Sequence, residues 1–257
     1  MGDTPLILSL DTATLGGSVC LTRGQQILAS VNGDAAASHS NTLLRNIDRV
    51  LKTTGVTIEQ VALFAASAGP GSFTGLRIGL ASVKAFAATL QRPCVGVPTL
   101  QAVAASAGPS KATVALLPAG RGELFAQLCS VDSNEIVRSI DQASHLKPAD
   151  VWNKYASLRT LTWAGPGARA HAPALKERAQ AEGIEFFEQT ESVLADERDG
   201  WILARPCENL AASVAAIAFS EFQRGNAVRP EDLRAIYVRP SDAEINQKWH
   251  NEKLPSI

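Results

Sequence analysis

The chain has 257 residues, of which 46% are hydrophobic, and a formal net charge of −1. This composition provides enough apolar surface for a sizeable core and excludes wholesale disorder. Because 24 basic side chains are balanced by 25 acidic ones, the chain alone is a poor candidate for gripping RNA or DNA by electrostatic attraction. Neither a signal peptide nor a membrane span is evident from the N-terminus or from any apolar run. We therefore expect a cytoplasmic α/β protein without membrane contact.

The first half of the sequence alternates strand and helix patterns. Three strands are predicted, followed by a helix, a strand, a long helix, a short strand and a further helix, at 5–10, 18–22, 26–31, 38–53, 61–67, 74–91, 94–97 and 99–107. The strands are short branched or alternating runs, and the helices show apolar residues every three or four positions. The element order is thus βββαβα, with a further strand and helix.

The second half begins in the same way after a plausible boundary at Gly108. Strands are predicted at 112–117, 123–131, 135–140, 158–164 and 184–188, and helices at 148–156, 172–182 and 209–224. A repeated order of three strands followed by alternating helices and strands predicts two related subdomains with a cleft between them. The expected units are residues 1–108, residues 109–227 and a charged, proline-marked tail at 228–257.

Two segments are candidates for binding phosphate. Asp11 and Thr12 end the first strand, where a carboxylate could reach a phosphate through a metal-bound water; the alternative, which the spacing favours, is that Asp11 only bonds the backbone of its own turn. Gly69, Gly71 and Ser72 lie between a strand and the long helix, a setting for anion binding at a helix N-terminus. The alternative is a tight turn capped by Ser72 or Thr74.

Metal and nucleophile chemistry find little support in the sequence. The four histidines are far apart, so none forms a pair one helical turn apart that could hold one ion. The four cysteines form no CxxC pair and read as buried apolar residues in a reducing compartment. Because no serine, cysteine or carboxylate constellation stands out either, we expect no catalytic residue and no metal site.

Several strings resemble one protein family. The opening at 7–14 is similar to the actin-like ATPase superfamily, and the strings at 68–79 (AGPGSFTGLRIG) and 95–100 (VGVPTL) are similar to the TsaB (YeaZ) family, as are 38–44, 120–125 and 237–240. The resemblance implies a two-lobed, actin-like (ribonuclease H-like) fold with duplicated βββαβα subdomains. It also implies a non-catalytic scaffold subunit that supports the transferase TsaD in making N6-threonylcarbamoyladenosine beside the anticodon of ANN-decoding tRNAs.

Further expectations follow from the resemblance. TsaD and TsaE homologues are the implied partners, with tRNA reached only through the complex and a homodimer allowed when TsaD is absent. In TsaD two metal-binding histidines occupy the positions of Thr99 and Val103, and Pro118 replaces an aspartate common in the family. Both differences speak against catalysis, although weak binding of ATP or ADP remains allowed. The rival hypothesis is a stand-alone actin-like ATPase or small-molecule kinase, which Asp11 and the glycine loops favour.

The same resemblance, together with a helix surface poor in charge, predicts the partner interface. The helices at 38–53 and 74–91 should lie side by side and pair with two helices of TsaD. The predicted interface residues are Leu43, Ile47, Gly75, Ile78, Gly79, Ser82, Ala85 and Thr89. The alternative is that the small residues only pack the helices within this chain.

Overall fold

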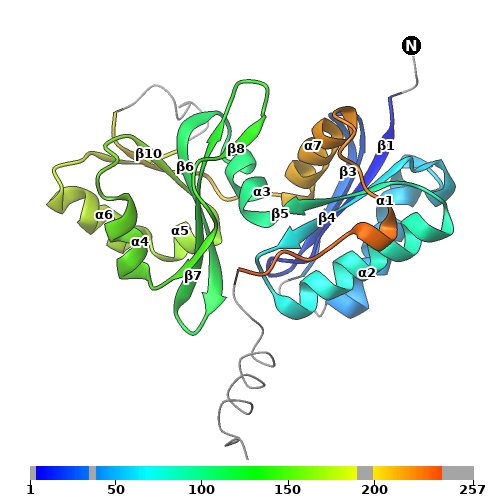
Figure 1. The fold of residues 1–257 in the computed structure, drawn as a ribbon, viewed down its shortest axis with the longest axis horizontal. Coiled ribbons are helices and arrows are strands. Elements are labelled where there is room, and N and C mark those ends of the chain that lie inside the picture. Colours follow the sequence, from blue (N-terminus) through cyan, green and yellow to red (C-terminus); the bar gives the residue numbers. More distant parts are fainter. Residues whose placement is uncertain (1–3, 35–38, 190–198, 239–257) are drawn as a thin grey trace, which may run out of the picture.

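A computed structural model describes residues 4–34, 39–189 and 199–238. Two β-sheets form the cores of two lobes that lie side by side (Figure 1). This two-lobed α/β architecture confirms the predicted fold class.

The first lobe is built on a five-stranded sheet. Its strands are β1 (Leu6–Asp11), β2 (Ser18–Arg23), β3 (Gln26–Asn32), β4 (Leu63–Gly69) and β5 (Cys94–Pro98). They lie in the order β3-β2-β1-β4-β5, with β1–β2 and β2–β3 antiparallel and the other pairs parallel. Every residue of β1 and β4 is buried, as expected for central strands covered on both faces.

Two helices cover one face of this sheet, as Figure 1 shows. They are α1 (His39–Thr54) and α2 (Phe73–Thr89), and the 3-10 helix η1 (Ile58–Gln60) follows α1. The apolar residues that α1 and α2 bury against the sheet recur at helical spacing: Leu43, Ile47, Val50, Leu80, Val83 and Ala87. The buried positions of both helices recur at the predicted helical spacing, although Leu44, which belongs to the predicted apolar residues of α1, is exposed.

The second lobe repeats the sheet order of the first. Its strands are β6 (Ser110–Gly120), β7 (Glu123–Val131), β8 (Val137–Ser139), β9 (Ser144–Leu146), β10 (Leu161–Ala164), β11 (Phe186–Glu188) and β12 (Trp201–Leu203). The order is β11-β12-β10-β6-β7-β8, and β9 also pairs with β7. Reading from β8, the first five strands match β3-β2-β1-β4-β5, so the predicted duplication is present with β11 added at one edge.

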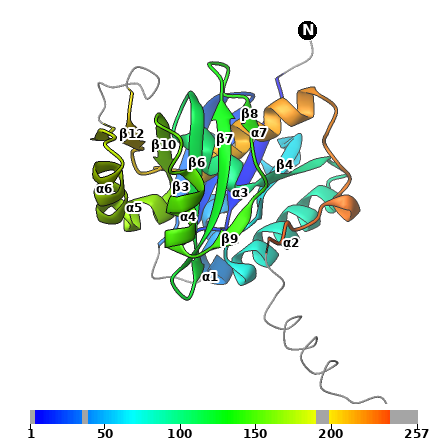
Figure 2. The ribbon, with the colours of Figure 1, turned by 60° about the vertical axis from the view of Figure 1, so that its left-hand side comes forward.

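The outer face of the second sheet carries three helices, seen together in Figure 2. They are α4 (Pro148–Tyr155), α5 (Pro166–Ala170) and α6 (Ala172–Ala181). They bury an aromatic cluster in which Trp163 meets the rings of Trp152, Tyr155 and Trp201 at centroid distances of 5.0–6.3 Å. These edge-on ring contacts anchor α4 to β10 and β12.

Two helices pack chiefly against the sheet of the other lobe, rather than against the sheet that precedes them in the sequence. α3 (Thr99–Ser106) follows the first sheet but packs on β6 and β7, whereas α7 (Leu210–Gln223) follows the second sheet but packs on β1 and β2. This corrects the expectation that the helix at 209–224 belongs with the subdomain 109–227. The reason is that each sheet has an inner apolar face to cover, and α3 and α7 contact each other while covering both.

The segment after α7 also belongs to the first lobe. Residues 226–238, here called the strap, include the 3-10 helix η3 (Pro230–Asp232). Val228 exchanges backbone hydrogen bonds with Cys94 at the β5 edge, Leu233 is 2% exposed, and the Ile236 amide donates to the Ala68 carbonyl at 2.7 Å. The tail predicted at 228–257 is thus a packed strap as far as residue 238, and the rest of that tail lies outside the described residues.

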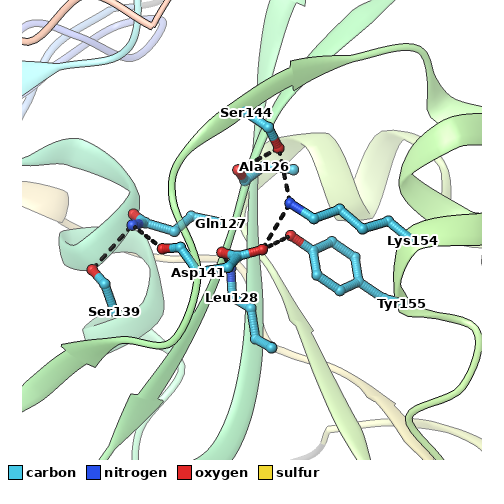
Figure 3. Close-up of polar contacts among 8 residues, drawn as sticks. All are labelled: Ala126, Gln127, Leu128, Ser139, Asp141, Ser144, Lys154 and Tyr155. Carbon is cyan, nitrogen blue, oxygen red and sulfur yellow. Dashed lines mark hydrogen bonds and ion pairs between the residues drawn. The ribbon is translucent and has the colours of Figure 1, made fainter.

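A polar network holds the β8–β9 connection to α4 (Figure 3). The Asp141 carboxylate accepts the Leu128 amide at 2.7 Å, the Tyr155 hydroxyl at 2.8 Å and an ion pair from Lys154 at 2.7 Å. Gln127 donates to Ser139 and to the Asp141 carbonyl. Between β8 and β9 the Asp141 carboxylate, instead of a neighbouring strand, accepts the Leu128 amide. Both strands have three residues and are shorter than the strand predicted at 135–140.

Tyr155 makes the unfolding equilibrium sensitive to alkaline pH. Its pKa is raised, chiefly by burial and then by its bond to the Asp141 carboxylate. Above about pH 10 an unfolded tyrosine ionises, while the native hydroxyl keeps its proton, so stability falls as pH rises. Chemical denaturation between neutral and alkaline pH should show this fall, and Tyr155→Phe should reduce its slope. An identical pH slope in the variant would contradict this assignment.

Candidate functional site

A cleft of about 910 Å³ lies between the two lobes, with lining residues from both. The first lobe contributes the β1–β2 turn and the loop before α2, including Ala13, Leu15, Gly71 and Ser72. The second lobe contributes Leu117, Pro118, Gly165, Pro166 and Arg169. The volume lies in the range of small-molecule pockets.

Asp11 does not line this cleft. Its side chain is fully buried at the end of β1, where one oxygen accepts the Ala13 amide at 3.0 Å and the other accepts the Thr14 hydroxyl. Both partners belong to its own turn. The structure therefore agrees with the interpretation that Asp11 bonds its turn, and it places the carboxylate where it is already occupied by local donors.

Thr12 packs against α2 instead of facing the cleft. Its hydroxyl donates to the Gly75 carbonyl at 2.7 Å, and the side chain is 2% exposed. A Cβ on Gly75 would lie 1.9 Å from the Thr12 carbonyl oxygen, and one on Gly79 would lie 2.2 Å from the Thr12 hydroxyl oxygen. The two helix glycines are therefore required for the close approach of α2 to the β1–β2 turn.

The glycine loop before α2 serves packing and capping. Gly69 has a φ of 118°, and a Cβ there would lie 2.2 Å from the Ile236 carbonyl oxygen of the strap. Gly71 approaches Ala13 closely, and Ser72 caps α2 by accepting the Gly75 amide at 3.2 Å. Of the five predicted phosphate-binding residues, Gly71 and Ser72 line the cleft, whereas Asp11, Thr12 and Gly69 do not.

The cleft offers few carboxylates to magnesium and a nucleoside triphosphate. Pro118 lines the second-lobe wall at the position where the resemblance expects an aspartate. Among the lining residues that the structure describes, the only charged side chains are Arg169 and Glu208. Each carboxylate oxygen of Asp11 already accepts a hydrogen bond from its own turn. Glu208 is then the lining carboxylate that remains for a magnesium ion, which proteins hold through one or two carboxylates and the phosphates of the nucleotide. The aspartate that the resemblance expects is missing.

Thr99 and Val103, which stand at the positions matched to metal-binding histidines, contribute to packing and hydrogen bonding in this chain. The Thr99 hydroxyl accepts the Gly69 amide at 3.0 Å, and Val103 is a buried residue of the cleft lining. Within residues 4–34, 39–189 and 199–238, no group of three His, Cys, Asp or Glu side chains could hold a metal ion. Burial also raises the pKa of the Cys20 and Cys129 thiols to about 12, and it raises that of Cys207, which lines the cleft.

The predicted partner interface divides into two groups. Leu43, Ile47, Gly75 and Gly79 are buried within this chain, against the first sheet or the β1–β2 turn. Their assignment to a partner surface is corrected, and for the two glycines the alternative of packing within the chain holds. The other four predicted residues are accessible on α2: Ile78 and Ser82 are half-buried, and Ala85 and Thr89 are exposed.

Sequence reasoning missed two charged residues of the cleft. Arg169 follows the Gly165–Gly167 string on α5, and its guanidinium donates to the Ala204 carbonyl at 2.8 Å. Glu208 precedes α7 in a segment without a motif. The glycines at Gly165–Gly167 indicated a turn, which could have pointed to Arg169. Glu208 reaches the cleft because the following helix, α7, packs on the first lobe, and no local pattern indicates that.

Comparison with known protein families shows to which family the chain belongs. A profile of the TsaD family, described as tRNA N6-adenosine threonylcarbamoyltransferase, matches residues 30–229. The chain belongs to the TsaD family. Within this family it is a TsaB (YeaZ)-type member, since it is 28% identical over 97% of its length, and 98% of the relative, to the Escherichia coli tRNA threonylcarbamoyladenosine biosynthesis protein TsaB.

Two further matches complete the comparison. The structure of YeaZ from Pseudomonas aeruginosa superposes with a TM-score of 0.70 at 24% identity, covering 91% of this chain and 99% of that one, which supports the fold. A tRNA N6-adenosine threonylcarbamoyltransferase from Brucella ovis is 40% identical over 28% of this chain and 20% of its own. Among the described residues, no helix is both long and apolar enough to cross a membrane.

Proposed function

We propose that this chain is a non-catalytic scaffold subunit in N6-threonylcarbamoyladenosine formation on tRNA, where it binds and supports a TsaD-type transferase. The observation that carries the proposal is the near full-length match to E. coli TsaB, a tRNA threonylcarbamoyladenosine biosynthesis protein. Two features of the cleft support it: Pro118 stands where the resemblance expects an aspartate, and the positions matched to metal ligands are Thr99 and Val103. Chemistry would then reside in the partner.

The accessible part of the α1–α2 surface is the proposed docking face. Ala85 and Thr89 are exposed, Ile78 and Ser82 are half-buried, and the stripe they form carries no charge. A stripe of small side chains allows a partner helix to approach within about 8–10 Å between axes. The proposed partners are TsaD and TsaE homologues, with tRNA held only through the complex. A homodimer is the proposed state when the transferase is absent.

No catalytic cofactor is part of this proposal. Weak binding of ATP or ADP at Gly71 and Ser72 is compatible with the cleft, without a metal ion. Titration calorimetry should show no gain in ATP affinity on adding magnesium, and the isolated chain should not hydrolyse ATP. The rival function, a stand-alone ATPase or small-molecule kinase, requires magnesium-dependent binding with turnover, so that result would overturn the scaffold proposal.

Affinity purification of the tagged chain from its own cells tests the partnership directly. We expect a TsaD-type transferase to co-purify, and a transferase left entirely in the unbound fraction would contradict the proposal. A control purification should use a chain carrying Ala181→Glu, since Ala181 is exposed on the far lobe. That variant should retain the partner.

A further inference from the structure

Within the described residues the chain passes between the two lobes twice, and the first passage has no loop. β5 ends at Pro98 in the first lobe, and α3 begins at the next residue, Thr99, and packs on β6 and β7 of the second. The proline ring fixes its own φ, here −57°. The Thr99 hydroxyl accepts the Gly69 amide at 3.0 Å, which ties the start of α3 to the first lobe. A hinge needs residues whose φ and ψ can change, and this passage offers few.

The second passage is fastened to a lobe at each end. It runs from Ala204, just after β12, to Asn209, just before α7. The Ala204 carbonyl accepts the guanidinium of Arg169 in the second lobe at 2.8 Å. The side-chain amide of Asn209 donates to the side-chain oxygen of Asn32 in the first lobe at 2.8 Å. Four residues, 205–208, separate these two attachments.

The helix α3 lies between the two sheets and is buried on most sides. Its eight residues include no charged side chain, and five of them are buried. It contacts β4 and β5 of the first sheet as well as β6 and β7 of the second, and it also packs on α7. A helix that is apolar nearly all round is typical of a protein core. Such a helix is a poor boundary for two bodies that move past each other.

One hydrophobic cluster runs through both lobes. It joins α3 and α7 to the inner faces of both sheets, and its members include Ile7 and Val97 of the first sheet and Leu117 and Phe125 of the second. Domains of one chain are expected to move relative to each other unless their interface is large and hydrophobic. Here the interface is the shared core itself, so relative motion would break contacts inside it.

We infer that the two lobes form one rigid body, and that the cleft between them has a fixed width and does not close around a ligand. The inference goes beyond the proposed function, because it concerns the motion of the chain and not its partner. Two-lobed enzymes commonly close around their substrate, which excludes water from the reacting groups. A cleft without that motion counts against the rival ATPase or kinase function for a reason separate from metal ligands.

Distances between spin labels on the two lobes test the inference. The labels go on α1 and α6, which lie in different lobes (Figure 1), through Arg49→Cys and Lys176→Cys at two exposed positions. Cys207 is changed to serine in this chain, because it is the half-buried cysteine and the other three are buried. Double electron–electron resonance then gives the distribution of distances with and without ATP.

Two leucine-to-alanine variants of the labelled chain separate the shared core from general loosening. Leu100 of α3 belongs to the cluster that runs through both lobes, whereas Leu175 of α6 belongs to the core of the second lobe alone; both are fully buried. Each substitution leaves a cavity, so both should lower the melting temperature. Only Leu100→Ala should loosen one lobe from the other.

We expect a single narrow distribution of distances for the parent labelled chain, which neither ATP nor Leu175→Ala changes. Leu100→Ala should broaden it. Two populations in the parent chain, or a shift on adding ATP, would show that the lobes move and would overturn the inference. A narrow distribution in folded Leu100→Ala would contradict the role given to the shared core. All of these results leave the proposed function standing, because that function rests on binding to the transferase.

Urea unfolding provides a second measurement that needs no change in the core. Trp152, Trp163 and Trp201 all belong to the second-lobe core, so their fluorescence in a Trp249→Phe chain reports that lobe, whereas circular dichroism reports both. Lobes that share a core should unfold together, with coincident transitions by the two signals. Separate midpoints for fluorescence and circular dichroism would overturn the inference.

Discussion

Replacing Gly75 with alanine is expected to lower the free energy of unfolding by about 3 kcal/mol or more. The new Cβ would lie 1.9 Å from the Thr12 carbonyl oxygen. Because this oxygen belongs to the backbone, it cannot rotate out of the way as a side chain can. The start of α2 would therefore have to move away from the β1–β2 turn. Urea denaturation of the variant, followed by circular dichroism, measures this loss.

Gly79 provides the matched comparison. A Cβ there would meet the Thr12 hydroxyl oxygen at 2.2 Å but the Thr12 Cβ only at 3.4 Å. Gly79→Ala should cost about 2 kcal/mol, and Thr12→Ala alone about 1 kcal/mol for its hydrogen bond. In combination they should cost less than their sum, because the clashing oxygen is gone. Thr12→Ala should not rescue Gly75→Ala, and strict additivity for Gly79 would contradict the packing described here.

Ala85→Glu is expected to weaken binding to the transferase by about a hundredfold or more. A glutamate on the docking face would be buried without a partner in the complex, a cost of about 3 kcal/mol, which corresponds to that loss of affinity. The side chain is exposed in the isolated chain, so the melting temperature should change little. Interferometry with the transferase measures the affinity.

Ala181→Glu is the control for this prediction, since it adds the same charge to an exposed alanine at the end of α6. It should bind the transferase like the wild-type chain. Equal, unimpaired binding by both variants would exclude the α1–α2 face as the docking surface. Ile78→Glu should also lose binding, but Ile78 is half-buried against the first-lobe core, so part of its effect would be on stability.

Local patterns in the sequence carry most of the fold. The predicted range of β7 matches the structure, and the α2 stripe of Leu76, Leu80 and Val83 is buried as its spacing indicates. β12 was not predicted, because Trp201–Leu203 is only three residues long and gives no period. The exchange of α3 and α7 between lobes was also missed, since periodicity shows that a helix has an apolar face but not which sheet covers it.

The residues of the candidate site were harder to predict from the sequence than the fold. The composition of the loop at Gly69–Ser72 suits both anion binding and close packing, and the contacts with Ala13 and Ile236 decide for packing at Gly69 and Gly71. Similarly, small residues on α2 allow close packing either of a partner helix or of a neighbouring turn of the same chain. Gly75 and Gly79 face the turn, whereas Ala85 faces outward, a distinction that depends on where Thr12 lies.

Reconstituted tRNA modification separates a scaffold from a catalyst most directly. The assay follows threonylcarbamoyl incorporation by the transferase with wild-type chain, Asp11→Asn, Glu208→Gln or Ala85→Glu. Asp11 and Glu208 are the carboxylates at or beside the cleft, and Ala85 lies on the docking face. We expect modification to persist with both carboxylate variants and to fail with Ala85→Glu. Loss of modification with a folded carboxylate variant that still binds the transferase would show that this chain takes part in the chemistry.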